Sequence, residues 1–418
     1  MNASKARKDL LHNFIVNVGD GSFFGFALGF TSFGTILPLF ISNLTESAIL
    51  IGLVPAIHNV GWQLPQLFTA RWIASLRRLK GRMLFLTTQE RIPFLFLALV
   101  AWFLFPNHKN LTLIVTFILL VWQGLGGGFT ANIWQILMSR VIPGKYRGRF
   151  FGVQSSAANL LSSVGAAAAG VILERFDSPL DFTILFSITT FLMVISWIFL
   201  SLTKEPAEGD ESGLATPPPF MEMIRISLHK EPSFAWFLFY RMLYQFGTMS
   251  SAFYMVYAVR NLGFGEAAAG ILTSVLLITA VIANPLLGWL ADRWKRNGIL
   301  VMGAVAAGLG SMLAWQSPSG SWFFPVVVLQ GIANVSYWTI GMAMTLDYGE
   351  EEDRPAYVGL SNTMIAPATI LAPIVGGWLA DFGGYQLTFL VSAILSLATA
   401  GIILAFVRDP HARVRGLA

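Results

Sequence analysis

Twelve long and nearly uninterrupted apolar stretches dominate the sequence and limit the folds that the chain can adopt. A helix that crosses a membrane needs about 20 mostly apolar residues, and each stretch has about that length. The strands of a membrane β-barrel would instead alternate over segments of about ten residues. We therefore predict an all-α membrane protein with transmembrane helices near residues 13–41, 48–74, 83–105, 111–138, 150–173, 182–202, 234–259, 267–290, 299–316, 322–346, 356–380 and 386–407.

The composition excludes several classes of soluble protein. Hydrophobic residues make up 55% of the chain and charged residues 12%, about half the usual quarter. The absence of cysteine excludes disulfides, thiolate nucleophiles and cysteine-ligated metal centres. The net charge of +5 comes from short basic clusters between apolar stretches, a pattern that indicates contact with membrane lipids and not with nucleic acid.

The distribution of Lys and Arg predicts how the chain is oriented. Basic residues gather at both termini and in every second loop, such as those at 77–82 and 140–149, whereas the opposite loops hold Lys109, Arg175 and Arg260. Positive charge favours the cytoplasmic side, so we predict that both termini are cytoplasmic. Compact loops and the lack of cysteine lead us to expect a bacterial inner membrane.

An internal repeat divides the chain into two halves. An offset of 207 residues aligns Gln123-Gly124 with Gln330-Gly331 and Arg147 with Arg354. Because six helices form each copy, both copies have the same orientation in the membrane. We predict an N-terminal six-helix bundle at 1–203, a cytoplasmic linker with a short amphipathic helix at 204–232, and a C-terminal six-helix bundle at 233–418.

The most specific local motif lies between predicted helices eight and nine. The segment from Gly288 to Arg296 reads Gly-Trp-Leu-Ala-Asp-Arg-Trp-Lys-Arg. It resembles the G-x-L-x-D-R-x-x-[RK]-[RK] loop of the major facilitator superfamily, a family of secondary transporters, and we do not assign a subfamily. The resemblance implies two bundles that expose a central site alternately to each side. It also implies a cytoplasmic gate formed by Gly288, Asp292, Arg293, Arg296, Arg147 and Arg354.

Charged and polar residues inside predicted helices are candidates for substrate binding or ion coupling, because a charge is costly inside a bilayer. Asn17 and Asp20 share a face of the first helix, and Arg241, Tyr244 and Gln245 share a face of the seventh. The family resemblance places these helices at the central cavity. We hypothesise that Asp20 takes part in proton or cation coupling and that Arg241 is its partner or an anion site; a static buried ion pair is the alternative.

Other polar residues complete the candidate wall of the site. Repeat-related glutamines beside glycines, with further polar and aromatic residues on helices four and ten, give the set Gln123, Asn132, Gln135, Gln330, Asn334 and Trp338. Glu90 and Arg91 are also charged, but helix three is a peripheral scaffold in the family. We therefore expect these two residues to form structural pairs with neighbouring groups.

The sequence contains no nucleotide-binding or hydrolase motif, so we predict a gradient-driven secondary transporter that is not an enzyme and has no cofactor or metal. Two hypotheses remain open: a proton-coupled exporter of amphipathic compounds, and an importer of a polar or anionic nutrient that works as a symporter or uniporter. A non-transporting membrane receptor is a remote alternative. The expected partners are a small-molecule substrate, H+ or another coupling ion, and membrane lipids, and we expect a monomer.

Overall fold

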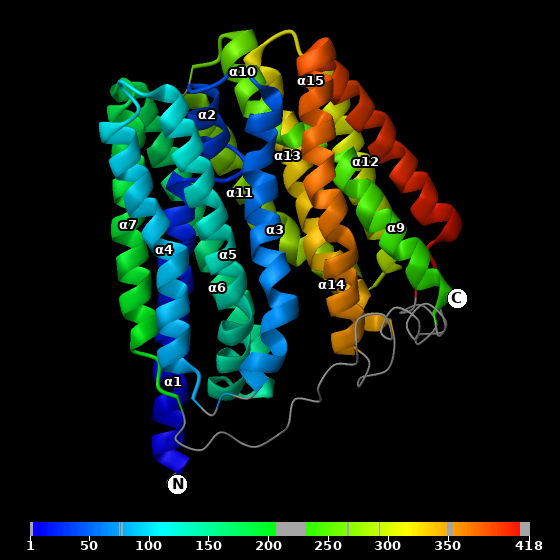
Figure 1. Ribbon diagram of the computed structural model, residues 1–418. Coiled ribbons are helices and arrows are strands. Elements are labelled where there is room, and N and C mark those ends of the chain that lie inside the picture. The colour runs from blue at the N-terminus through cyan, green and yellow to red at the C-terminus, as the bar shows by residue number, and fades with distance from the viewer. Residues whose placement is uncertain are drawn as a thin grey trace. The chain divides into compact units, whose positions relative to one another are not determined.

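A computed structural model describes residues 3–74, 76, 78–205, 231–265, 267–291, 293–348 and 354–409. Helices make up most of this part of the chain, as Figure 1 shows, and it holds no β-strand. Two predicted features lie outside the described residues: the amphipathic helix of the linker, and Asp292. The first half contains α1 (Ala3–Phe30), α2 (Ile36–Ser42), α3 (Ala48–Ala74), α4 (Lys80–Phe103), α5 (Lys109–Val141), α6 (Gly144–Arg175) and α7 (Leu180–Ser201).

The second half contains more breaks within its helices. Its elements are α9 (Pro232–Gly247), η1 (Met249–Phe253), α10 (Tyr254–Leu262), α11 (Ala267–Ala291), α12 (Arg296–Trp315), η2 (Gly320–Trp322), α13 (Phe323–Val335), η3 (Ser336–Ile340), α14 (Gly341–Asp347) and α15 (Arg354–Phe406). Each of the twelve predicted apolar stretches corresponds to one or more of these helices, which confirms the predicted all-α membrane fold.

Three predicted helices are interrupted, and the last two meet at a kink. The first is broken after Phe30, the seventh passes through the 3-10 segment η1, and the tenth contains the π-helical segment η3. The last two share the label α15 but are two helices that meet at a kink, where Gly384 is non-helical with φ 80°. A residue with a side chain would be strained at that φ, so glycine allows the chain to reverse there.

Nine helices in the described chain are long and apolar enough to cross a membrane. One of them, at Leu360–Phe406, holds two of the predicted stretches. The first and seventh predicted helices are not among the nine. Asn13, Asn17 and Asp20 lower the hydropathy of α1, and α9 has only 16 residues before η1 begins.

The described residues divide into two compact units. Unit 1 draws on Met1–Leu44, Ile57–Ala215 and Glu266–Ser274, and unit 2 on Thr45–Ala56, Thr216–Gly265 and Val275–Ala418. Two helices are therefore divided between the units. The first residues of α3 belong to unit 2, and the first residues of α11 belong to unit 1. The predicted bundle boundaries at residues 203 and 233 stay a prediction.

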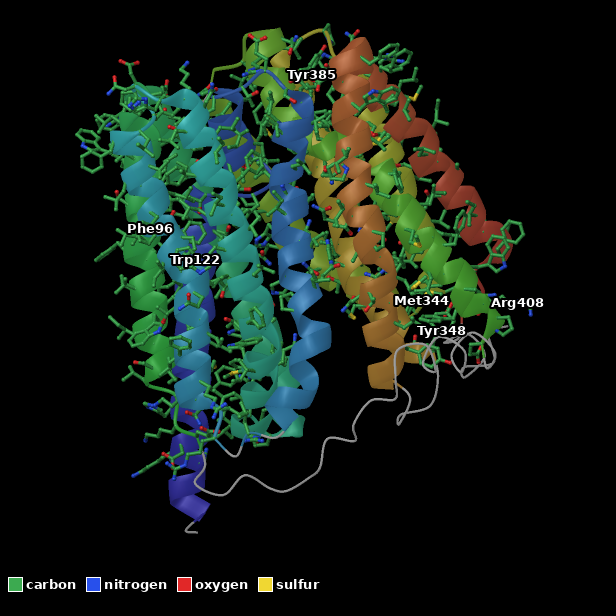
Figure 2. The ribbon with its side chains drawn as sticks, viewed as in Figure 1. Phe96, Trp122, Met344, Tyr348, Tyr385 and Arg408 are labelled. Atoms are coloured by element: carbon green, nitrogen blue, oxygen red, sulfur yellow. The ribbon has the colours of Figure 1, made fainter. Side chains whose placement is uncertain are left out.

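Within unit 1, α1 packs against α6 and α7, and α4 packs against α5 and α7. Aromatic and amide side chains link α4 to α5. The rings of Phe96 and Trp122, labelled in Figure 2, lie 5.9 Å apart, and the Trp122 indole N–H donates to Gln89 Oε1. In unit 2, α12 and α9 pack against α15, and the Tyr348 hydroxyl donates to the Arg408 carbonyl oxygen (Figure 2).

Gly29 allows α1 to approach α6 closely. A Cβ atom at this position would lie 2.2 Å from the Ser162 carbonyl oxygen, and backbone atoms cannot move aside as a side chain can. We expect Gly29→Ala to lower the free energy of unfolding by about 1–3 kcal/mol through overpacking, measured by unfolding of the purified protein in detergent. Gly152→Ala in α6 is the control, because a Cβ atom there meets nothing within 4 Å. Equal stability of the two variants would contradict the close approach.

Candidate functional site

Unit 1 contains a cavity of about 280 Å³ lined by side chains from α1, α3, α4, α5, α6 and α7. Three charged residues face it: Asp20, Glu90 and Arg91. All three are buried, and buried charges inside a membrane protein are retained where they serve a function. The described residues hold no group of three acidic, histidine or cysteine side chains that could bind a metal ion.

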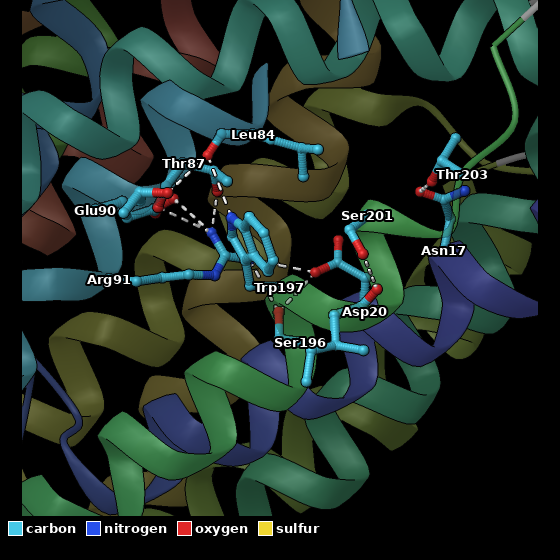
Figure 3. Close-up of polar contacts among 12 residues, drawn as sticks. Asn17, Asp20, Leu84, Thr87, Glu90, Arg91, Ser196, Trp197, Ser201 and Thr203 are labelled. Atoms are coloured by element: carbon cyan, nitrogen blue, oxygen red, sulfur yellow. Dashed lines mark hydrogen bonds and ion pairs between the residues drawn. The ribbon is translucent and has the colours of Figure 1, made fainter. Parts of the chain in front are cut away.

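Arg91 lies at the centre of the charged cluster, and Figure 3 shows its contacts. Its Nη2 lies 3.2 Å from Asp20 Oδ1 and donates to Ser196 Oγ at 2.9 Å. Its Nη1 donates to the carbonyl oxygen and the hydroxyl of Thr87. Ser196 also donates to Asp20 Oδ1 at 2.6 Å. Arg91 therefore ties α1, α4 and α7 together.

Glu90 has a different environment from Asp20. Its Oε2 lies 3.7 Å from Arg91 Nη1, a distance at which the two form an ion pair but no hydrogen bond. Its Oε1 points toward Gly127 of α5, where an added Cβ atom would lie 3.0 Å away. The glycine thus leaves room for this carboxylate at the edge of the cavity.

Aromatic rings form much of the remaining cavity wall. Phe24, Trp62 and Trp134 contribute from three different helices, and the Arg91 guanidinium already lies 5.2 Å from the centre of the Phe24 ring. Aromatic faces attract cations, including quaternary ammonium groups. A cavity that combines such faces with two carboxylates can hold a molecule that is both apolar and positively charged.

The structure brings two of the predicted site residues of the first half into this cavity, Asp20 and Gln135. Asn17 is fully buried beside it, where its amide donates to the Asn13 carbonyl oxygen and its Oδ1 accepts from Thr203 (Figure 3). Gln123 contacts the ring of His58, with 3.0 Å between Oε1 and Nδ1. The side chain of Asn132 lies outside the described part.

The predicted group around Arg241 forms a second cluster, in unit 2. The Arg241 guanidinium donates to Ser361 Oγ at 2.6 Å and lies 5.0 Å from the centre of the Tyr337 ring. The Tyr244 ring stacks on Tyr337 at 4.4 Å, and Gln245 donates to the Tyr337 hydroxyl. Arg241 is 1% exposed, and its Nε has no hydrogen-bond partner among the described residues.

The remaining candidates of unit 2 lie on α13 and η3. Gln330 donates to Asn334 Oδ1 at 3.2 Å, so these two amides contact each other. Trp338 packs edge to face against Tyr337 and is 37% exposed. This aromatic contact connects Trp338 to the Arg241 cluster through a shared neighbour.

Residues of the predicted gate form pairs within unit 2 where the structure describes them. Arg296 forms an ion pair with Asp347 and donates through its backbone N–H to Asp409. The Arg293 guanidinium lies 3.9 Å from the centre of the Trp289 ring. Gly288 has no atom within 4 Å of an added Cβ. The side chains of Arg147 and Arg354 lie outside the described part, as does Asp292.

A carboxylate also caps the first turn of a helix in unit 1 by accepting hydrogen bonds from its backbone N–H groups. Glu205 accepts hydrogen bonds from the backbone N–H groups of Leu79 and Lys80, at the beginning of α4, and lies 3.7 Å from Arg140. In unit 2, Asp409 accepts from the first backbone N–H of α12. An acidic residue that follows the sixth predicted helix of each half therefore caps the third predicted helix of the same half, a correspondence that the sequence offsets did not reveal.

Two expectations about the charged residues need correction. Asp20 is paired with Arg91 and not with Arg241, which has Ser361 and Tyr337 as its neighbours. Arg91 pairs with Asp20 and Ser196, as the expected structural pairing with neighbouring groups requires. The peripheral role expected for helix three did not predict that Glu90 and Arg91 also line the cavity. The sequence held a signal for them, because two adjacent charges inside an apolar stretch are themselves evidence of a buried polar site.

Comparison with known proteins identifies the family. The family model described as Major Facilitator Superfamily matches residues 21–265 and 237–417. The chain therefore belongs to the major facilitator superfamily, and it is a multi-pass membrane protein. A structure of the nucleoside transporter NupG covers 95% of this chain with a TM-score of 0.75 and 15% identity. A D-xylose-proton symporter covers 96% with a TM-score of 0.73, also at 15% identity. At these identities the two structures establish the fold alone.

Similar sequences include transporters of small cations. The vesicular acetylcholine transporter of Mus musculus is 31% identical over 150 residues, which are 36% of this chain and 28% of that protein. A Na(+), Li(+), K(+)/H(+) antiporter of Planococcus maritimus is 30% identical over 169 residues, 38% of this chain and 39% of the antiporter. The matches thus span well under half the length of these relatives.

Proposed function

We propose that this transporter exports amphipathic organic cations in exchange for protons, using the cavity of unit 1. The observation that carries the proposal is the composition of that cavity, in which two carboxylates, one guanidinium and three aromatic rings line the same space. If both carboxylates are ionised, the charged groups carry one net negative charge, which a proton or a cationic cargo can neutralise. Aromatic faces supply apolar contact and cation–π attraction.

Two relatives support the choice of a cation as cargo. One is named for acetylcholine and the other for exchange of Na+, Li+ and K+ against H+, and all four of these cargoes are cations. The aromatic wall favours an organic cation over a bare metal ion, because an inorganic ion would need several oxygen ligands in place of rings. Antiport against a proton gradient requires a group that holds either the proton or the cargo but not both, and a carboxylate meets this requirement.

Exchange can be measured in liposomes that contain the purified protein and a pH-sensitive dye. We expect tetraphenylphosphonium or tetraethylammonium to dissipate an imposed proton gradient, and Na+ to do so less. Trp134→Ala should weaken the response to the organic cations, whereas Trp378→Ala, on the exposed surface of α15, is the matched control. A gradient that none of these cations dissipates would contradict the proposed exchange.

Import of a polar or anionic nutrient is the second candidate function, and it is favoured by Arg241. This guanidinium is buried in unit 2 without a carboxylate partner among the described residues, so a carboxylate or phosphate of a substrate would neutralise it. Gln245 and Tyr337 beside it could supply hydrogen bonds. The same liposomes loaded with sugars, carboxylates or nucleosides distinguish the two functions.

The proposed direction depends on the proposed orientation. We place both termini in the cytoplasm of a bacterial cell, because the basic residues gather on the side of the chain ends. The ion pair between Arg296 and Asp347 then belongs to the cytoplasmic end of unit 2. Such pairs at a closing surface bias the equilibrium between the inward-open and outward-open states, which is the role we propose for the predicted gate.

A further inference from the structure

Asp20 and Glu90 line the same cavity, but they differ in their hydrogen bonds and ion pairs. We propose that Glu90 is the carboxylate that exchanges its proton for the charge of the cargo, and that Asp20 is a positioning residue that fixes Arg91. This inference rests on the proposed cation exchange at the cavity of unit 1. It reassigns the coupling role from the first predicted helix to the third.

Asp20 is held in place by hydrogen bonds from two neighbours. Its Oδ1 accepts a hydrogen bond from Ser196 and another from Arg91, and charge-assisted hydrogen bonds are about twice as strong as neutral ones. Arg91 in turn is fixed by Thr87 and Ser196. Protonation of Asp20 would leave the buried guanidinium without its closest counter-charge, and breaking a buried pair in this way is strongly unfavourable.

Glu90 has fewer partners. Its ion pair with Arg91 has a distance of 3.7 Å, which is too long for a hydrogen bond. Arg91 is already neutralised by Asp20, so a second ionised carboxylate beside it is stabilised less than the first. Its Oε1 lies beside Gly127, and both residues line the cavity. A proton or a cation arriving from the cavity can therefore reach this carboxylate without displacing a protein group.

The charges around Glu90 support the exchange of one proton for one monovalent cation. The charged groups that face it are Asp20 from α1 and Arg91 from its own helix, and the other described lining residues, from α3, α5, α6 and α7, are uncharged. With Glu90 protonated, the charges of Asp20 and Arg91 cancel. When a monovalent cation binds, the O–H bond of Glu90 breaks, its proton passes to water in the cavity, and the carboxylate balances the charge of the cargo. One proton leaves for each cation bound.

Proton release on binding tests this assignment directly. The purified full-length protein in weakly buffered detergent solution is titrated with tetraphenylphosphonium, while a dye reports released protons and a dialysis assay reports bound cation. For the native protein we expect one proton per cation, and a Kd that rises about tenfold for each unit by which the pH falls below the titration of the exchanging group. Glu90→Gln should bind the cation without proton release and with a Kd independent of pH.

The variant Asp20→Asn leaves Glu90 as the described counter-charge of Arg91, so the pH at which release is half complete should fall, and below that pH one proton should still be released for each cation bound. Glu90→Asp should also keep the release, and Glu174→Gln, which removes an exposed carboxylate of α6, is the matched control. If Glu90→Gln does not fold, Gly127→Ala serves instead, because its methyl group crowds Glu90 Oε1. It should shift the pH at which release is half complete, and an unshifted midpoint would count against Glu90.

The outcomes separate this inference from the proposed function. Release that persists in Glu90→Gln and is absent from Asp20→Asn at every pH would overturn the assignment of Glu90, while cation exchange would stand. A native protein that binds neither tetraphenylphosphonium nor tetraethylammonium, and that fails to dissipate a proton gradient in liposomes, would overturn the proposed function and this inference together.

Discussion

Replacing Arg91 with Met is expected to lower the free energy of unfolding by about 3–5 kcal/mol, the cost of removing one partner from a buried ion pair. The guanidinium is the shared cation of Asp20 and Glu90 and also donates to Thr87 and Ser196. Without it, two carboxylates remain beside one another in a buried cavity. The loss can be measured by unfolding in mixed detergent micelles, with transport in liposomes as a second readout.

A double variant identifies the origin of this loss. In Asp20→Asn combined with Arg91→Met, the paired charges are removed together, so the double variant should be more stable than Arg91→Met alone. Restored stability without restored transport would show that the cluster is retained for function. If the two substitutions instead lower the stability additively, Arg91 and Asp20 are not energetically coupled, and the ion pair would have to be discarded as the reason for the loss.

The membrane helices could be predicted from sequence because burial in lipid requires long apolar segments. For this reason α3 begins and ends where the apolar stretch does, at residues 48 and 74. The interruptions inside the predicted helices were not predictable. The π-helical segment at Ser336–Ile340 depends on local packing, whereas the break at Gly384 falls in the gap between the predicted helices at 356–380 and 386–407, where the sequence contains Asp381 and a pair of glycines.

The candidate site was only partly predictable. Asp20 was identified because a lone carboxylate within an apolar helix has a high cost. Its partner was not, since hydropathy gives no information on which helices are neighbours or how each is rotated about its axis. Successive residues of a helix point about 100° apart, so small rotations decide whether Arg91 faces α1 or lipid. Family resemblance directed attention to Arg241, whereas packing of α4 against α7 places Arg91 beside Asp20.

Arg241 leads to a prediction of opposite sign from that for Arg91. Replacing it with Met is expected to raise the free energy of unfolding by about 1–4 kcal/mol, the range found when buried ion pairs or triads give way to apolar residues of similar size. Arg241 has a hydrogen bond to Ser361 and a ring contact with Tyr337, but unlike Arg91 and Arg296 it has no carboxylate partner among the described residues. The same unfolding assay in mixed micelles measures the change.

Arg296→Met is the matched control in unit 2, because Arg296 has a carboxylate partner in Asp347, and its removal should lower the stability. A large loss of stability in Arg241→Met would mean that this arginine is a structural element of α9, and the second candidate function would lose its main support. A gain in stability together with unchanged cation exchange would separate Arg241 from the cavity of unit 1. A gain together with lost exchange would mean that the transport cycle needs a positive charge in each unit, because a destabilising buried charge is retained only where function requires it.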